Sequence, residues 1–566
     1  MAAEVEDGAV TGAPEEQPAR PRIVRRGLSF TGVVLAFVFC CFSLTPSLLP
    51  RAWFLQGAIS GVTAIIGYGL GSLLGALGRS RGGPFRNRSG HVERRWWLGM
   101  IGAGLVAVVI FGLLGVGWQQ DMREVMGMDP AADWSGLPIL LLALVVFAFV
   151  LLVCRWIRLG TRTVIRFLLR FVPKPVAIVV GIVIAVIAVI GFLQGFLFDR
   201  LVDAANSSFG LVNEGTTEGT EQPTSTYLAG SPDSLIPWDT LGVKGRDFVG
   251  LAPTEQEISD YLGTPATAPI RVYVGLDSAD SAEKRADLAI RELERTGGFD
   301  RPLLVVFTTT GSGWVDPKAV DTLEYMNAGN TAIVASQYSF LPSWLSFLVD
   351  KSKATEAGET MIGAVEAKLA TIQPAQRPRL LVFGESLGSF GTETAFQTLD
   401  ALGKGTNGAL LEGPVNVNPV WNEVTDGREQ GSPVWKPVYD AGKNVRFGQF
   451  TGDLDSPAGS FDEPRTVYLQ NATDPIVWWN VGLILNKPEW LNGQRGPDVS
   501  PDMRWYPFIT FWQVAADMAF STGVPRSHGH VYGSNAADAW AAIAPPAGWT
   551  ANDTAKLKDY IDRIDS

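Results

Sequence analysis

The second half of the sequence holds one serine whose neighbours are typical of a catalytic nucleophile. Residues 384–388 read GESLG, a G-x-S-x-G pattern in which Ser386 would lie on a sharp turn between a strand and a helix. Such a turn exposes the hydroxyl and leaves no room for side chains at Gly384 and Gly388. The pattern predicts that Ser386 is a nucleophile. The alternative is a glycine-rich turn without chemistry.

A serine nucleophile needs a base, and two histidines follow the predicted turn. His528 and His530 lie in the segment VPRSHGHVYG, late in the chain, where the order Ser, acid, His places the base. We favour His530, because Gly-His followed by an apolar residue resembles the histidine loop of many α/β-hydrolases. His528 is the alternative base, or a residue that supports the loop or contacts the substrate.

The acid of such a site should follow a late strand. Asp474 comes at the far end of the β-rich run 466–474, just beyond its apolar part, and precedes a proline that tightens the turn. Its role would be to select the histidine tautomer and to stabilise the imidazolium. Alternatively, Asp474 only caps the next helix or forms an Asx turn. Asp453 and Asp455 are fallback candidates in a segment that resembles a surface loop.

Backbone amides near Ser386 could stabilise an oxyanion. The amide of Leu387, at the predicted helix start, is one expected donor, and the small-residue turn 308–313 offers Thr310 or Ser312 as the second. The chain has three cysteines, all in apolar segments, and three histidines. We therefore expect neither a cysteine-rich nor a multi-histidine metal centre, and no metal or cofactor.

The elements that must position these residues are strands alternating with helices. Six short β-rich runs lie at 270–276, 302–310, 331–339, 379–386, 408–415 and 466–474. Between the first two runs, an apolar face with acidic first-turn residues and terminal glycines predicts a helix. Strands connected in this way imply crossover units and a mostly parallel sheet. In that sheet, Ser386 follows a buried strand and the segment 389–403 is the next helix.

The charge divides the 566 residues into two unlike parts. Up to position 200 there are 19 Lys and Arg against 11 Asp and Glu, and from 201 onward there are 27 against 46. The balances of +8 and −19 give the net charge of −11. A basic, apolar first part and an acidic second part predict a membrane section followed by a soluble domain. Nucleic-acid binding is not expected, because the acidic part would repel phosphates.

Five apolar runs in the first part are each about 20 residues long, enough to cross a bilayer as helices. They lie near 28–49, 54–77, 97–118, 137–156 and 176–198. The first could instead be a signal peptide, although no small-residue cleavage site follows it. Arginines cluster before the first run, between the second and third, and between the fourth and fifth. The positive-inside rule then predicts a plasma-membrane protein with a cytoplasmic N-terminus and an extracytoplasmic catalytic domain.

These observations predict four segments along the chain. They are a cytoplasmic tail (1–27), a transmembrane α-helical domain (28–199), a linker (200–250) and a catalytic domain (251–566). Residues 206–234 are rich in Ser, Thr, Gly, Glu and Pro and show no apolar period. This composition predicts a flexible tether within the linker.

Two longer stretches resemble a known family. The sequence TTTGSGWVDPKAVDTLEYMNAGNTAIVASQYSFLPSWLSFLVD, followed by GESLGSFG and preceded by five apolar runs, resembles the bacterial integral-membrane α/β-hydrolases, a family common in actinobacteria. The resemblance extends from about 28 to 532. It implies the α/β-hydrolase fold, a nucleophile at Ser386 and a base within the pair His528 and His530. The histidine-glycine oxyanion motif of other α/β-hydrolases is replaced here by Thr310-Gly311.

The predicted substrate follows from position and surface. Aromatic and aliphatic clusters at 339–349, 475–485 and 504–512 would either pack the core or a lid, or form an apolar acyl channel facing the bilayer. A domain held beside the membrane meets lipid esters more often. We therefore predict a lipase- or esterase-like serine hydrolase, or an acyltransferase, acting on membrane or envelope lipids. The alternatives are a peptidase or amidase with the same machinery, or a non-catalytic membrane scaffold. No oligomeric state is predicted.

Overall fold

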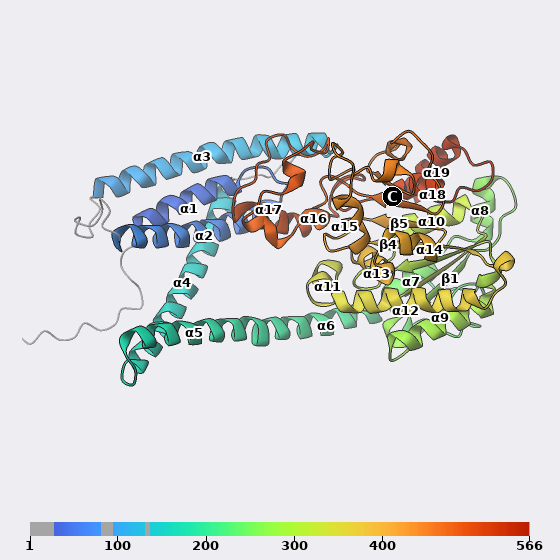
Figure 1. The fold of residues 1–566 in the computed structure, drawn as a ribbon, viewed down its shortest axis with the longest axis horizontal. Coiled ribbons are helices and arrows are strands. Elements are labelled where there is room, and N and C mark those ends of the chain that lie inside the picture. The colour runs from blue at the N-terminus through green and yellow to red at the C-terminus, as the bar shows by residue number, and fades with distance from the viewer. Residues whose placement is uncertain (1–27, 81–93, 131–135, 565–566) are drawn as a thin grey trace, which may run out of the picture.

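The computed structural model describes residues 28–80, 94–130 and 136–564, so the predicted tail 1–27 lies outside the described residues. The molecule has two parts, which follow one another along its long axis (Figure 1). One part consists of long apolar helices from the first 200 residues. The other contains a β-sheet covered by helices and includes all the predicted site residues.

Four helical segments of the first part are long and apolar enough to cross a membrane: Trp53–Gly78, Arg94–Val125, Gly136–Leu168 and Lys174–Glu214. They belong to α2(Trp53–Ser80), α3(Arg94–Val125), α4(Gly136–Leu168) and a run that begins with α5(Lys174–Phe192).

The remaining apolar helix, α1(Phe30–Ser43), is shorter than the predicted run 28–49. Its 14 residues extend about 21 Å, less than the roughly 30 Å of a bilayer core. The helix ends before Pro46 and Pro50, which cannot donate backbone hydrogen bonds. Four of the five predicted spans therefore meet the length criterion.

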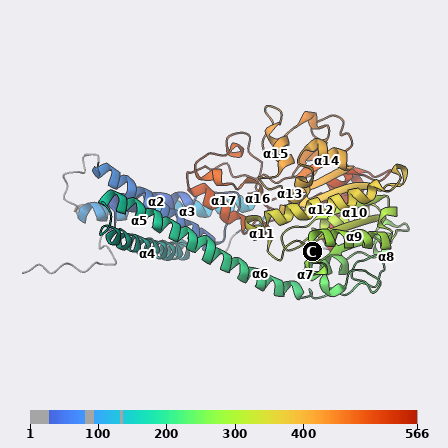
Figure 2. The same cartoon turned by 60° about the horizontal axis from the view of Figure 1, so that its bottom comes forward.

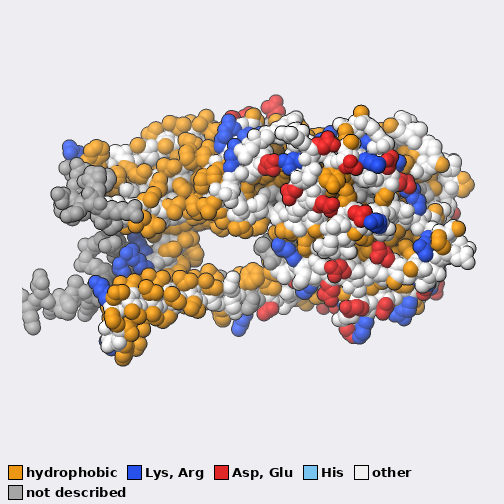
Figure 3. Space-filling view, in the orientation of Figure 1, with side chains coloured by type: hydrophobic (Ala, Val, Ile, Leu, Met, Phe, Trp, Pro, Cys, Tyr) orange, Lys and Arg blue, Asp and Glu red, His pale blue; other side chains and the backbone are white. Residues whose placement is uncertain are grey.

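The surface of these helices is unusually apolar. Large aliphatic side chains on α3, α4 and α5 are more than half exposed, among them Leu113, Leu144 and Ile187. They form a broad apolar region over the helical part, whereas charged side chains gather over the sheet domain (Figure 3). A continuous apolar surface of this kind indicates contact with another apolar phase.

The segment 200–250 is not the flexible linker that the sequence analysis predicted. After the π-helical turn η1(Leu193–Phe198), α6(Asp199–Glu214) continues toward the sheet domain (Figure 2). The helix α7(Gly242–Gly250) follows, and the buried Leu228, Ala229, Ile236 and Leu241 between them join the main core. These apolar residues follow no period of two or 3.6, so no pattern in the sequence indicates that they are buried. The polar composition around them therefore led to the wrong prediction of a flexible tether.

The sheet has seven parallel strands in the order β1-β3-β2-β4-β5-β7-β6, which confirms the predicted parallel sheet. The strands are β1(Ile270–Val274), β2(Leu303–Thr308), β3(Thr331–Ser336), β4(Arg379–Glu385), β5(Gly408–Glu412), β6(Val445–Gly448) and β7(Arg465–Leu469). The four-residue β6 was missed by the sequence analysis. It lies at the edge of the sheet and is too short to show a pattern.

Helices cover both sides of the sheet (Figure 1). One group is α9(Ala282–Thr296), α12(Lys351–Ala370) and α13(Leu387–Phe396), and the other is α10(Pro317–Met326), α18(Ala536–Ile543) and α19(Ala551–Ile564). The α9 helix begins after Ser281, which caps it, and ends at Gly297 in the left-handed conformation, as the predicted start and stop signals require. The Phe307 and Phe383 rings stack at 4.4 Å in the core.

Candidate active site

Ser386 lies on a strained turn between β4 and α13. Its backbone angles are φ 52° and ψ −122°, and its N–H donates to the Glu412 carbonyl at 2.8 Å. A Cβ atom at Gly384 would lie 2.6 Å from the backbone of Gly388, and one at Gly388 would lie 2.2 Å from the Thr308 carbonyl oxygen. Both glycines are therefore required by close backbone packing. Serine rarely adopts a positive φ, so the surrounding structure must hold Ser386 in this conformation.

The structure brings His530 and Asp474 together. His530 Nδ1 lies 2.6 Å from Asp474 Oδ2, and both side chains are buried. The Tyr532 hydroxyl also donates to Asp474 Oδ2 at 2.6 Å, while Asp474 Oδ1 accepts the Ile476 amide at 2.8 Å. Asp474 thus caps the following helix and also binds the histidine, so the two interpretations of the sequence are compatible. The sequence analysis missed Tyr532.

The other ring nitrogen of His530 faces the end of β4. Nε2 lies 3.7 Å from Glu385 Oε1, and a Cβ atom at Gly413 would lie 2.4 Å from His530 Cε1. Since the Ser386 amide bonds to Glu412, the imidazole and Ser386 are both next to the end of β5. With Nδ1–H assigned to the Asp474 bond, Nε2 is the nitrogen left to accept a proton.

The surroundings of His530 favour its charged form. Burial alone would lower the pKa of its imidazole, but the Asp474 charge, the hydrogen bond to Asp474 and the Glu385 charge outweigh this. The pKa of His530 therefore lies above its ordinary value of 6.5. A base with a raised pKa holds an abstracted proton more firmly, which suits general-base chemistry near neutral pH.

His528 has a different acid partner. Its Nδ1 lies 2.9 Å from Asp498 Oδ2, which also accepts bonds from Gln449 Nε2 at 2.8 Å and from the Thr473 hydroxyl at 2.7 Å. The sequence analysis missed Asp498, because the irregular segment around it follows no strand.

The fallback acid Asp453 binds backbone amides and a lysine rather than a histidine. Asp453 Oδ2 accepts the Gln449 and Phe450 amides, and its Oδ1 pairs with Lys436. Asp455 lies in the same short 3₁₀ turn, η7(Asp453–Asp455). The surface-loop interpretation of this segment agrees with the structure.

The predicted oxyanion donors are positioned differently from one another. Leu387 is the first residue of α13, where helix amides have no intrahelical acceptor. The turn after β2 lies against Gly388, so it is next to the nucleophile. The Thr310 amide, however, donates to the Trp314 carbonyl at 3.0 Å and is occupied. Thr310 is therefore a poor amide donor in this arrangement, and Leu387 and Ser312 remain predictions.

Two more carboxyl groups lie beside Ser386, and both favour their protonated forms. Burial and then the Asp316 charge raise the pKa of Glu385 to about 8. Burial and the charges of Asp316 and Glu385 also raise the pKa of Glu412 well above its ordinary value. The sequence analysis identified none of these three carboxyl groups, because they come from separate strands and loops.

The apolar helices contact the catalytic domain close to the histidine segment. Arg51, which follows α1, forms a buried ion pair with Asp517 of α17(Ile509–Met518), with Nε and Oδ1 3.0 Å apart. Asp517 Oδ2 also accepts the Leu48 amide at 3.1 Å. Just beyond α17, the Ser521 carbonyl accepts the His530 amide at 2.7 Å. An ion pair, a short stretch of backbone after α17 and one hydrogen bond thus connect the N-terminal helices to His530.

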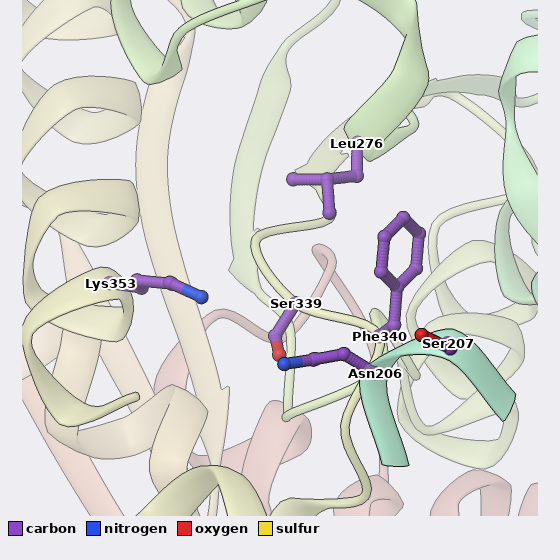
Figure 4. A pocket seen from close by; sticks show the side chains of 6 residues that line it. All are labelled: Asn206, Ser207, Leu276, Ser339, Phe340 and Lys353. Atoms are coloured by element: carbon purple, nitrogen blue, oxygen red, sulfur yellow. The ribbon is translucent and has the colours of Figure 1, made fainter. Parts of the chain in front are cut away.

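A cavity of about 380 Å³ lies between α6 and the sheet domain (Figure 4). It is lined by Asn206, Ser207, Leu276, Ser339, Phe340 and Lys353. None of the predicted site residues is among them, so this cavity is separate from the His530–Asp474 pair.

A parallel sheet with a strained serine after a central strand and a late His–Asp pair defines an α/β-hydrolase fold. Residues 270–557 match the model of an alpha/beta-hydrolase family, and residues 44–253 match the model of that family's N-terminus. The chain belongs to this alpha/beta-hydrolase family. No curated protein and no solved structure matches the chain.

Proposed function

We propose that the protein is a membrane-anchored serine hydrolase or acyltransferase that acts on lipid esters. The observation that carries this proposal is the 2.6 Å bond between His530 and Asp474, formed beside the strained turn at Ser386. This arrangement has the three roles of a serine-nucleophile mechanism: nucleophile, base and orienting acid.

In the first step, Ser386 Oγ attacks the acyl carbonyl while His530 Nε2 takes the hydroxyl proton. Asp474 holds the imidazole through Nδ1 and stabilises the imidazolium, and the Leu387 amide donates to the oxyanion. The imidazolium then returns the proton to the departing alcohol, which leaves an acyl-enzyme. In the second step, His530 deprotonates water or a second alcohol, whose oxygen attacks the acyl carbonyl. The acyl–Ser386 bond then breaks, and the imidazolium returns the proton to Ser386 Oγ. The product is a free acid in one case and a new ester in the other.

An apolar surface near the junction of the two parts supports a lipid substrate. Val481 and Leu485 are 68% and 64% exposed, and Trp512 on α17 is 40% exposed. Beside them, the ring of Phe520 lies 5.8 Å from that of Phe54 on α2. Acyl chains leaving the apolar helices would meet these side chains first.

The proposed orientation is a cytoplasmic N-terminus and an extracytoplasmic catalytic domain. Hydrogen bonds pair Thr31 with Gly71 near one end of α1 and Ser43 with Ser60 near the other, so α1 runs antiparallel to α2. If α1 counts as a crossing, five passes separate the two ends of the chain. The end of the helical part farthest from the sheet carries Lys and Arg (Figure 3), as a cytoplasmic face would. A reporter joined to the C-terminus should then be active only outside the cytoplasm.

The catalytic proposal is tested by labelling the full-length protein in detergent with a fluorophosphonate. Wild type and the surface control Ser432→Ala should be labelled, and Ser386→Ala should not. The labelled enzyme is then given phospholipids, short- and long-chain esters, and peptide amides, with and without an alcohol acceptor. Ester cleavage that requires Ser386 supports the proposal. Exclusive amide cleavage would indicate a peptidase, and a folded, unlabelled, inactive wild type would contradict catalysis by Ser386.

A further inference from the structure

Three buried carboxyl groups converge at the carboxyl end of the sheet, below the nucleophile. Glu385 and Glu412 are the last residues of β4 and β5 and are paired in register. Asp316 lies at the start of α10, whose Lys318 amide it caps through Oδ1. One carboxylate oxygen from each of the three residues lies within 4.8 Å of the other two.

Glu412 differs from the other fully buried glutamates. Within the described part of the chain, neither of its carboxylate oxygens has a hydrogen-bond partner, and its exposure is 0%. Glu393, equally buried, accepts four bonds, from Asn418, Val420, Trp421 and Tyr468. Glu292 and Glu324 likewise have hydrogen-bonding partners, including arginines. The fold supplies donors for buried glutamates elsewhere but supplies none to Glu412.

The positive side chain beside the cluster is a histidine, since His530 Nε2 lies 3.7 Å from Glu385 Oε1. Among the described residues, no lysine or arginine pairs with Glu385 or Glu412, and Glu385 Oε2 is a further buried oxygen without a partner. A buried carboxylate without a counter-charge or hydrogen bonds is strongly unfavourable. A bound cation supplies the counter-charge and the missing ligand interactions together.

We propose that Asp316, Glu385 and Glu412 bind one divalent cation of the oxygen-preferring class, Ca²⁺, Mg²⁺ or Mn²⁺. Three carboxylates are hard ligands that suit these ions, which are held at roughly 2.0–2.6 Å from oxygen. Oxygens separated by up to 4.8 Å are compatible with ligands on different sides of one such ion. The sequence analysis weighed only cysteine and histidine ligands, so it could not identify this site.

The ion would join three elements that surround the nucleophile. It would connect the ends of β4 and β5 to the start of α10, and Glu385 directly precedes Ser386. Binding should therefore stabilise the turn at Ser386 against local unfolding. It requires no catalysis, so the inference stands or falls separately from the proposed function.

The test measures cation binding to the full-length protein in detergent after treatment with EDTA. Calorimetric titration with CaCl₂, MgCl₂ and MnCl₂ should show one saturable site per chain for at least one ion. The same ion should raise the thermal unfolding midpoint. Glu412→Gln, which keeps the shape and removes the charge, should weaken binding by roughly tenfold or more and abolish the thermal shift. Ser386→Ala should bind as wild type does.

Glu393→Gln is the matched control, because it makes the same change at a buried glutamate outside the cluster and should leave binding unchanged. Should Glu412→Gln fail to fold, Asp316→Asn takes its place with the same expected loss. Absence of saturable binding by all three ions would overturn the proposal. Undiminished binding in the folded cluster variant would also overturn it.

Discussion

His528 and His530 lie two residues apart in the same loop. Each bonds to its own aspartate, and the two pairs have different surroundings. His530 bonds to Asp474 at 2.6 Å and His528 bonds to Asp498 at 2.9 Å. Each pair could be mistaken for the other from distances alone. The second nitrogen of His530 faces the end of β4, whereas the ring of His528 packs edge-on to Phe450 at 6.1 Å. The candidate base is therefore identified by what its second ring nitrogen faces, and not by the bond to its acid.

The two acids differ in the same way. Asp474 is held by a helix amide and by the Tyr532 hydroxyl, so its bonds all serve to hold one carboxylate toward one imidazole. Asp498 instead accepts bonds from Gln449 and Thr473 and connects several loops. Asp498 therefore has the contacts of a residue that stabilises loops, and Asp474 those of a residue that orients a base.

The largest expected difference between the two pairs is in kcat/KM after each imidazole is removed. His530→Ala should lower kcat/KM by about 10⁴-fold or more and abolish fluorophosphonate labelling, because Ser386 loses its base. His528→Ala should lower kcat/KM by less than about tenfold, since only loop support is lost. Steady-state kinetics on a short-chain ester measure both variants. Equal losses in both, or a larger loss in His528→Ala, would assign the base to His528.

The next largest effect should come from the acids. Asp474→Asn should lower kcat by about 10⁴-fold, because the amide favours the wrong tautomer and no longer stabilises the imidazolium. Asp498→Asn should lower the thermal unfolding midpoint and should reduce kcat much less than Asp474→Asn does. The ratio of the two kcat losses is the measurement. A ratio near one would mean that both pairs contribute to the same step.

The sequence predicted the residues that depend on local patterns. Gly384 lies against the backbone of Gly388 within one turn, and the order Ser, acid, His led to Asp474 and His530 as candidates. Six of the seven strands were likewise recognisable as short apolar runs. The strands and the turn are determined by neighbours in the chain, whereas the acid and the base were reached through their order along it.

Residues that depend on long-range packing could not be predicted. Asp498 reaches His528 from an irregular segment, and Asp316, Glu385 and Glu412 meet only because separate strands and helices end at the same edge. The buried contact of Arg51 with Asp517 joins residues 466 positions apart. No periodicity of the sequence indicates such pairs, because they follow from the tertiary fold alone.

A smaller effect is expected at the contact between the N-terminal helices and the histidine loop. Asp517→Asn removes the charge that pairs with Arg51 and should loosen α17, from which the chain continues to Ser521 and its bond to His530. A displaced base costs about ten- to a hundredfold in kcat. Labelling rates and kcat should fall together. The bond between His528 and Asp498 should persist, so the variant affects only one of the two pairs.

A matched control for this variant is Asp321→Asn, which alters the buried pair of Asp321 on α10 with Arg271 of β1. Because Arg271 belongs to the edge strand β1, this control should lower the unfolding midpoint and leave the labelling rate of the folded protein near that of wild type. If both variants slowed labelling equally, a general loss of stability would explain the effect, and no specific role of the helix contact would remain.

The smallest effect is expected at Tyr532, whose hydroxyl donates to Asp474, whereas Asp498 binds Gln449, Thr473 and His528. Tyr532→Phe removes one neutral hydrogen bond, worth about 1 kcal/mol, so kcat/KM should fall only a few-fold. Without this donor the Asp474 charge is less dispersed and stabilises the imidazolium more, which raises the pKa of His530 further. Because the base must be neutral, the acidic limb of the kcat/KM profile should move to higher pH. Tyr560→Phe, away from the site, should leave the limb in place, and a shift to lower pH in Tyr532→Phe would contradict the assigned role of Asp474.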